Sequence, residues 1–386
     1  MKSVLQIAAI VLIFLTPTPR VLAQETHPGF TANGYVSTLH SSIFESFDDE
    51  WFNENIIHNR LNLRLYAGSK VTFGMEMRNR IFTADMLTYY PGYASGIDAD
   101  RGWLDMSWNV VDERSFLFNI FLDRLWIDFS GKNYQLRLGR QRINWGQTFV
   151  WNPNDVFNTY SYFEFDYPER PGSDAIRLQI YPSYSSTLEI AAKIDSEDNI
   201  TAAALYRINK WGYDIQFLGG YISGSDLMLG TGWSGSLGSA SFRGELSWFQ
   251  PYKSFSDTTG TGLFTVGLDR SFSNNANLQF QLMYCNKPVD FNDFNEFYSG
   301  NLSARDLAFS EISLFASAQY PVTPLVKIGL STIFYPGING VFAGPTIDAS
   351  LAENVDFSFF WQHFKADMLS EELKMNLAFL RVKYSF

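Results

Sequence analysis

The stretch KMNLAFLRVKYSF, residues 374–386, decides the fold of this chain. Every second position in it is apolar, namely Ala378, Leu380, Val382, Tyr384 and Phe386. The positions between the last of these are polar, namely Arg381, Lys383 and Ser385. Successive side chains of a β-strand point to opposite faces of its sheet. The stretch therefore predicts a strand with one apolar face and one polar face.

The same alternation recurs along most of the chain. Residues 60–67 (RLNLRLYA), 124–129 (RLWIDF) and 355–361 (VDFSFFW) are examples. We count about 18 segments of this kind, an even number, as single-chain transmembrane β-barrels have. In such a barrel the apolar face meets lipid and the polar face lines the lumen. In a soluble sandwich, the alternative, the apolar face would form a core.

The connections between these segments separate the two alternatives. Short turns, such as Gly68-Ser69, Gly131-Lys132 and 273–275, alternate with longer loops. The longer loops are expected at 45–55, 83–116, 147–172, 287–309 and 365–373. Barrels of this class have short periplasmic turns and longer extracellular loops, whereas a sandwich has no reason to sort its loops in this way. The sequence predicts an all-β fold, a transmembrane antiparallel up-and-down β-barrel with both termini on the short-turn side.

The N-terminal residues have the features of a signal peptide. A basic start, Met1-Lys2, precedes an apolar run over 4–15, and Val21-Leu22-Ala23 supplies a small residue before the expected cut. An uncleaved anchor is the alternative, but the apolar run is short for one. We expect a signal peptide over 1–23, a short periplasmic lead over 24–29 and a barrel over 30–386, so the protein is exported.

The end of the chain carries a second expectation. A final strand whose last residue is aromatic resembles the closing strand of bacterial outer-membrane β-barrels. The resemblance implies that Tyr384 and Phe386 form the signal read by the barrel-insertion machinery. It also implies an outer-membrane protein surrounded by lipid and lipopolysaccharide.

Composition excludes several classes of partner and site. The formal net charge of −11 argues against nucleic acid, since phosphate binding needs a basic patch. The single cysteine, Cys285, excludes an internal disulfide and a cysteine-based metal cluster. Aromatic residues make up 17% of the chain, as expected of a barrel that needs aromatic girdles at two membrane interfaces.

Arginines crowd the polar faces of the predicted strands in the first half of the chain. They are Arg60, Arg64, Arg78, Arg80, Arg124, Arg137 and Arg177. A guanidinium stays charged and binds carboxylate or phosphate in a forked manner, so an arginine wall in a lumen favours anionic solutes. The alternative is a lattice of ion pairs with Glu76, Asp128, Glu189 and Glu245 that only rigidifies the lumen.

Two further arginines break the alternation. Arg140 and Arg142 share the parity of Leu136 and Leu138, so a regular strand would point them at lipid. That placement costs roughly 2–4 kcal/mol per arginine at the membrane midplane. We expect a bulge near Gly139 that turns both side chains inward and extends the basic wall.

The loop that follows is dense in aromatic residues. It has nine between residues 145 and 167, of which Trp145, Trp151, Tyr160, Tyr162 and Phe163 are the expected constriction of the lumen. Aromatic faces beside Arg140, Arg142 and Arg170 suit a sugar or another ring-bearing solute. Packing that simply closes the barrel is the alternative.

This region also carries a family resemblance. The runs GRQRINWG (139–146), WNPND (151–155) and RPGSDA (170–175) resemble a family of uncharacterised porin-like outer-membrane barrels of Bacteroidetes-type bacteria. More loosely, the chain is similar to alginate-export and phosphate-selective porin-like proteins. The resemblance implies a passive channel with a basic lumen, although the acidic overall balance departs from that pattern.

Enzyme chemistry is not expected, and neither is a cofactor. No GxSxG, HExxH or phosphate-binding loop occurs. Of the four histidines, only His40 and His58 are candidates for a metal site, beside the acidic residues 48–50 at the rim, and solvated polar groups are the alternative. A first strand near Phe30 leaves no room for the plug domain of a TonB-dependent transporter.

The sequence thus predicts a porin-like channel for small hydrophilic solutes, with a preference for anions as its open question. A non-transport barrel is the alternative, namely a scaffold, an adhesin or the membrane subunit of a secretion or export complex. The pattern does not indicate an oligomeric state.

Overall fold

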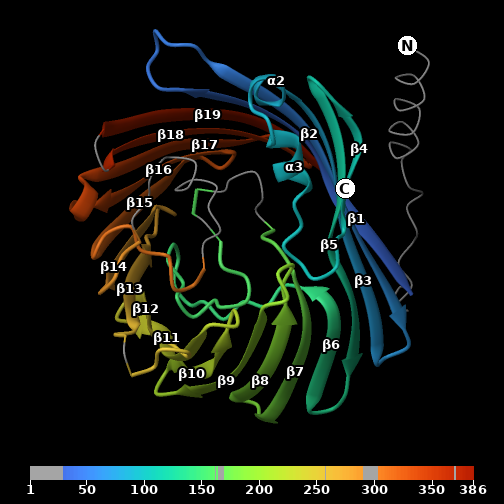
Figure 1. The fold of residues 1–386 in the computed structure, drawn as a ribbon, viewed down its shortest axis with the longest axis vertical. Helices are drawn as coiled ribbons and strands as arrows, with labels where there is room; N and C mark the ends of the chain where they lie inside the picture. Colours follow the sequence, from blue (N-terminus) through green and yellow to red (C-terminus); the bar gives the residue numbers. More distant parts are fainter. Residues whose placement is uncertain (1–28, 161, 164–168, 257, 290–302, 369–370) are drawn as a thin grey trace.

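The computed structural model describes residues 29–160, 162–163, 169–256, 258–289, 303–368 and 371–386. Nearly all of its regular structure is one antiparallel β-sheet (Figure 1). The strands are β1 (Phe30–Phe44), β2 (Phe52–Ala67), β3 (Val71–Ala84), β4 (Ser107–Glu113), β5 (Phe116–Ser130), β6 (Tyr134–Gln141), β7 (Ser173–Ser183), β8 (Ser186–Ile194), β9 (Ile200–Lys210), β10 (Tyr213–Ile222), β11 (Asp226–Leu237), β12 (Ala240–Pro251), β13 (Thr261–Ser271), β14 (Asn277–Cys285), β15 (Ile312–Thr323), β16 (Val326–Tyr335), β17 (Gly340–Ala352), β18 (Val355–Met368) and β19 (Glu371–Ser385).

Among the described residues, three short helices complete the regular structure: α2 (Asp85–Tyr89), α3 (Tyr93–Asp98) and the 3-10 turn η1 (Pro336–Ile338). Figure 1 shows α3 inside the ring of strands and α2 at its rim. Among the described residues, no helix is long and apolar enough to cross a membrane.

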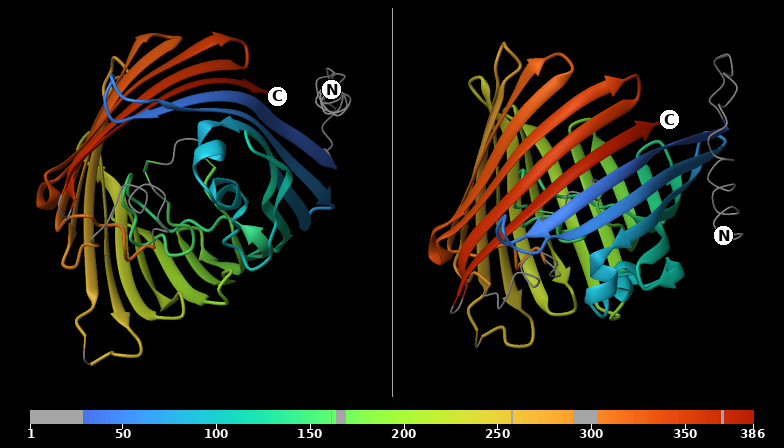
Figure 2. Two further views of the ribbon diagram at one scale, coloured as in Figure 1. Left: turned by 45° about the horizontal axis from the view of Figure 1, so that its top comes forward. Right: turned by 90° about the horizontal axis from the view of Figure 1, so that it is seen from above.

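The sheet closes on itself because β1 pairs with both β2 and β19. Eighteen strands make the closed ring, and β4 is an additional strand beside one end of β5, where β6 has already ended. The tilted strands of the wall are visible in Figure 2. The predicted fold class, a transmembrane antiparallel β-barrel of about 18 strands, is confirmed.

The closing strand has the two faces that its sequence predicts near the chain end. Leu380, Tyr384 and Phe386 expose 44%, 45% and 49% of their surface on the outside of the barrel. Further from the end, Leu377 and Phe379 occupy the inward positions and are buried. The inward face is therefore polar only near the short-turn end, because folded segments cover the rest of it.

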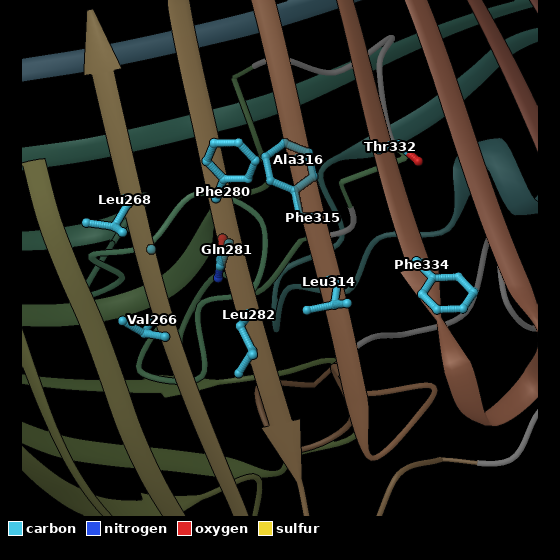
Figure 3. Close-up of a pocket in the computed structure, with 11 residues that line it drawn as sticks. Val266, Leu268, Phe280, Gln281, Leu282, Leu314, Phe315, Ala316, Thr332 and Phe334 are labelled. Atoms are coloured by element: carbon cyan, nitrogen blue, oxygen red, sulfur yellow. The ribbon is translucent and has the colours of Figure 1, made fainter. Parts of the chain in front are cut away.

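Ala316 of β15 marks a hollow in the apolar outer face of the wall. Larger side chains of β13, β14, β15 and β16 surround it and leave a shallow apolar groove of about 380 Å³ (Figure 3). Those side chains are Val266, Leu268, Phe280, Leu282, Leu314 and Phe334. Apolar exposure of this kind suits contact with lipid acyl chains.

Most of the expected connections are present, with short turns at one end of the barrel and the longest segments at the other. Two of the expected loops are wrong. Residues 83–116 are not one loop, because they contain α2, α3 and the strand β4. Residues 365–373 are not a loop, because β18 continues to Met368 and β19 begins at Glu371, with Lys365 paired to Lys374. Charged residues such as Lys365 and Glu372 therefore belong to the paired strands β18 and β19. Lys365 and Glu372 form an ion pair of 2.7 Å.

Candidate functional site: the barrel interior

Between β6 and β7, the described residues of segment 142–172, namely 142–160, 162, 163 and 169–172, lie inside the barrel (Figures 1 and 2). Its side chains Trp145, Trp151, Phe157 and Phe163 are buried in one large apolar core. The opposite side of this core is the inward face of the wall from β8 to β18, including Leu205, Leu218, Phe249, Leu263, Met283 and Phe342. The interior segment is therefore packed against the wall along much of the ring.

Polar wall residues fix the backbone of this segment. Glu245 of β12, which is completely buried, accepts the N–H of Thr148 at 3.0 Å and that of Asn154 at 2.8 Å, and also bonds to the N–H of Gln147. Gln281 of β14 accepts the N–H of Val150 at 2.8 Å. Such bonds satisfy backbone groups that have left water, which makes the conformation of the segment specific.

Two more wall residues hold the start of the segment. The indole N–H of Trp145 donates to Glu189 of β8 at 2.7 Å, and the amide of Gln216 of β10 donates to the Trp145 carbonyl at 2.7 Å. The aromatic residues expected to form a constriction thus divide into two groups. Trp145, Trp151 and Phe163 are buried in the core, whereas Tyr160 and Tyr162 are only half-buried.

The half-buried part of the segment brings together charged and aromatic groups. The Arg170 guanidinium carbon lies 3.2 Å from the centre of the Tyr160 ring. Arg142 and the buried Asp155 lie near this pair, close enough to influence its titration. Burial removes the Asp155 carboxyl from water and raises its pKa to about 6. Among the described residues, one of its oxygens has no hydrogen-bond partner and the other accepts the Trp145 N–H at 3.3 Å.

The arginines of β2 and β3 converge on one carboxylate. Asp123 of β5 is completely buried, forms an ion pair with Arg60, and accepts from Arg78 at 2.9 Å. Arg60 also contacts Glu76 at 2.6 Å and Glu169 of the interior segment at 3.9 Å. This part of the expected arginine wall is a closed ion-pair network rather than a row of free charges.

A β-bulge explains why Asp123 is available. The register of β3 with β5 shifts between Glu76 and Met77, which face Arg124 and Leu122, so Asp123 is the extra residue. Both Asp123 and Arg124 are buried at this point. The sequence does carry a signal for the bulge: the apolar positions of β5 change from even numbers (116–122) to odd numbers (125–129).

The bulge expected near Gly139 is wrong in position. The register of β6 with β5 and β7 runs without a shift through Gly139, whose φ is +106°. Arg140 nevertheless avoids lipid, because it is 2% exposed and bonded to Asp174 at 2.7 Å and to Asp100. Asp100, which precedes β4 in sequence, is one of the two carboxylates that neutralise Arg140. Arg140 is therefore kept from lipid without a bulge at Gly139.

The remaining arginines differ in how far they are neutralised. Arg137 pairs with Asp128 at 2.9 Å, and Arg177 pairs with Glu189 at 2.8 Å, as the lattice alternative expected. Arg80 donates to Asn119 at 2.9 Å and to a carbonyl of α3. Of the arginines expected to line the lumen, Arg64, Arg124 and Arg142 have no carboxylate within ion-pair distance among the described residues.

The two histidines considered for a metal site lie on opposite faces of the wall. His58 pairs with the buried Ser37 and lies on the inward face. His40 is an odd number of residues from Ser37 along β1, so it lies on the opposite face, where it bonds to Asn55 at 2.9 Å. The structure does not bring them together with residues 48–50, and no group of potential metal ligands forms among the described residues. The chain end lies against β1, with the Phe386 N–H bonded to the Gly34 carbonyl at 2.9 Å.

No protein-family model and no curated protein matches this chain. Solved structures do share its fold. Acinetobacter baumannii OccAB2 has a TM-score of 0.60 and 9% sequence identity, with 92% of this chain and 98% of OccAB2 covered. Pseudomonas aeruginosa OccK8 (OprE) has a TM-score of 0.59 and 10% identity over 92% and 98%. A double variant of OccD1 (OprD) has a TM-score of 0.60 and 11% identity over 94% and 97%.

Identities this low show the shared barrel fold and do not transfer a function. They support the β-barrel fold that the expected resemblance implies. The closer likeness to Bacteroidetes-type barrels, and the looser one to alginate-export and phosphate-selective porin-like proteins, stay predictions, as does the division of the chain into signal peptide, lead and barrel.

Proposed function

We propose that this protein is an outer-membrane, porin-like channel for the passive passage of small hydrophilic solutes, with a modest preference for anions. The observation that carries the proposal is the closed barrel with a polar, arginine-bearing interior on the side of β2 to β7. The solved structures that share the fold are Occ and OprD outer-membrane porins rather than enzymes, which supports a channel.

The anion preference rests on arginines that form no ion pair among the described residues. Arg64 is exposed toward the short-turn end, and Arg142 lies in the interior segment beside Arg170. The paired residues Arg60, Arg78, Arg140 and Arg177 contribute little net charge, because each has a carboxylate partner. A lumen with a few uncompensated guanidinium groups favours anions without binding them tightly.

The test is a conductance measurement on the purified protein in planar bilayers. In a salt gradient, the reversal potential should correspond to anions passing more readily than cations. Replacing Arg64 and Arg142 by glutamine should shift it toward cations, because two lumen charges are lost. The control is Arg114→Gln in the turn between β4 and β5, which should leave the reversal potential unchanged. Cation selectivity in the unaltered protein would contradict the anion preference.

The alternative, a non-transport barrel such as a scaffold, an adhesin or a subunit of an export complex, is favoured by one observation. An apolar core lies in the interior between the described residues of segment 142–172 and the wall from β8 to β18. An occluded scaffold gives no single-channel current in the same experiment. Current in the unaltered protein therefore decides between the two functions.

A further inference from the structure

Within the described chain, strand β4 has one edge without a partner strand. It pairs with β5 alone, and no other strand of the described chain continues the ladder on its far side. Asn109 and Ser107 on its inner face are tied to α3, through a 2.9 Å bond to the Ala94 carbonyl and a 3.0 Å bond to Asp98. Its outer face exposes Trp108 and Val110. An open edge of this kind presents unpaired N–H and C=O groups to a further strand.

The open edge of β4 lies next to a gap in the wall, where β6 ends and β7 begins; we call this gap the notch. At the level where β6 ends, β7 also begins, at Ser173, so neither strand extends the wall toward the long-loop end. Just before β4, Gly102 forms a bridge with Asp195, and the Ser196 N–H donates to the Arg101 carbonyl at 3.2 Å. These bonds close the bottom of the notch, and beyond it no described strand pairs with the edge of β4.

An acidic cavity lies at the foot of the same edge. Its volume is about 440 Å³, and its lining includes Asp98, Asp100, Asp105, Trp103 and Ser196. Arg140 neutralises Asp100, whereas Asp98 and Asp105 have no ion pair in the described part of the chain. The exposed Trp103 offers an indole face to a cation. The cavity therefore complements a lysine or arginine side chain.

We propose that the free edge of β4 docks an extended basic segment of another polypeptide as an added strand, with one of its cationic side chains in the cavity lined by Asp98, Asp105 and Trp103. Main-chain hydrogen bonds to an open edge provide affinity in this mode of recognition, and pockets beside the edge select the side chains. Further acidic residues near the notch, Asp112, Glu113 and Glu197, favour the same charge in the partner.

A second copy of this chain does not fit the edge. Antiparallel pairing of two identical strands places the two-fold axis perpendicular to their sheet, which would turn one barrel upside down in the membrane. Parallel pairing of the same two edges needs an axis along the strands, and these tilt away from the membrane normal. The partner is therefore a different polypeptide that approaches the long-loop end.

The proposal is tested with a synthetic probe and the full-length protein in detergent micelles. The probe is a fluorescent peptide of alternating lysine and valine with seven residues, the length of β4. A matched peptide carries N-methyl groups along one edge, which removes its main-chain donors but keeps its charge. By anisotropy at physiological ionic strength, the first peptide should bind and the second should bind at least about tenfold more weakly.

Two variants test the cavity. Asp98→Asn with Asp105→Asn should weaken binding of the first peptide by about tenfold or more. The matched control, Asp48→Asn with Glu50→Gln in the connection between β1 and β2, removes the same charge elsewhere and should leave binding unchanged. Equal binding of the N-methylated peptide, equal effects of the two double variants, or no binding at all would overturn the proposal. If the protein itself self-associated and the first peptide abolished this, the partner on the β4 edge would be a second copy of the chain, and the proposal of a different polypeptide would be wrong.

Discussion

The carboxylate of Glu245 accepts the backbone N–H of Asn154 at 2.8 Å, joining a wall strand to a segment that crosses the interior. The same side chain bonds to the N–H groups of Gln147 and Thr148. Hydrogen bonds are directional, so three donors on one carboxylate define the path of the segment more closely than apolar packing does. The conformation of the interior thus depends on a residue that the wall supplies.

Replacing Glu245 by alanine should therefore destabilise the protein. Each backbone N–H left without an acceptor costs about 1–3 kcal/mol in the free energy of unfolding. Glu245→Gln should cost less, because the amide oxygen still accepts. Denaturant unfolding followed by tryptophan fluorescence measures the loss, and limited proteolysis shows whether segment 142–172 becomes accessible. Glu353→Ala in an exposed turn is the control; if it matched Glu245→Ala, the anchoring role would be wrong.

The network around Asp123 gives a second prediction. Asp123→Asn removes the charge that Arg60 and Arg78 share, and breaking a buried ion pair costs about 3–5 kcal/mol. Asp128→Asn removes a pair whose arginine, Arg137, is partly exposed, so water screens its loss and the cost should be smaller. Unfolding free energies of the two variants in the same detergent make the comparison. Equal losses would show that burial of the network adds nothing.

The sequence predicted the wall well because lipid imposes one requirement on every strand. An apolar residue at each second position, as at Leu380, Val382 and Tyr384, follows from lipid contact alone and needs no knowledge of neighbours. The same reasoning identified most arginines that lie on the inner side. Inside the barrel no such uniform solvent exists, so alternation does not tell which inward residues meet water and which are covered.

What the sequence left open is therefore a matter of distant partners. Arg140 is neutralised by Asp100 and Asp174, which are far from it along the chain, and no local pattern pairs them. The bulge at Asp123 was detectable from the change in apolar parity along β5, yet the irregularity was expected at Gly139 instead. At Gly139 the register does not change. Arg140, the residue that breaks the alternation, is buried instead.

Stability should depend on pH through Asp155. Burial raises the pKa of its carboxyl from 3.8 in an unfolded chain to about 6. Between these two values the folded side chain holds a proton that the unfolded one has lost, so the free energy of unfolding falls as the pH rises through this window. Above it, Asp155→Asn should be more stable than the unaltered protein; below it, the difference should vanish.

The measurement is the midpoint of thermal unfolding of both proteins across the acidic and neutral range. Other carboxyl groups titrate in the same range, so the quantity of interest is the difference between the two curves. A constant difference at every pH would mean that Asp155 ionises equally in the folded and unfolded states.

Gly139 gives a prediction about the backbone of the region with the most distinctive sequence. Its φ of +106° is rare for residues with a side chain, and a Cβ there would lie 2.3 Å from the Leu125 carbonyl oxygen of the paired strand. Gly68, in the turn after β2, has a φ of +72° and nothing within 4 Å of the same position. Gly68→Ala should therefore cost only about 1–2 kcal/mol, the penalty of the left-handed conformation. Gly139→Ala should cost more, since β5 and β6 must separate locally as well, and denaturant unfolding of the two variants tests the order. A reversed order would mean that the chain at Gly139 relaxes without disturbing its pairing.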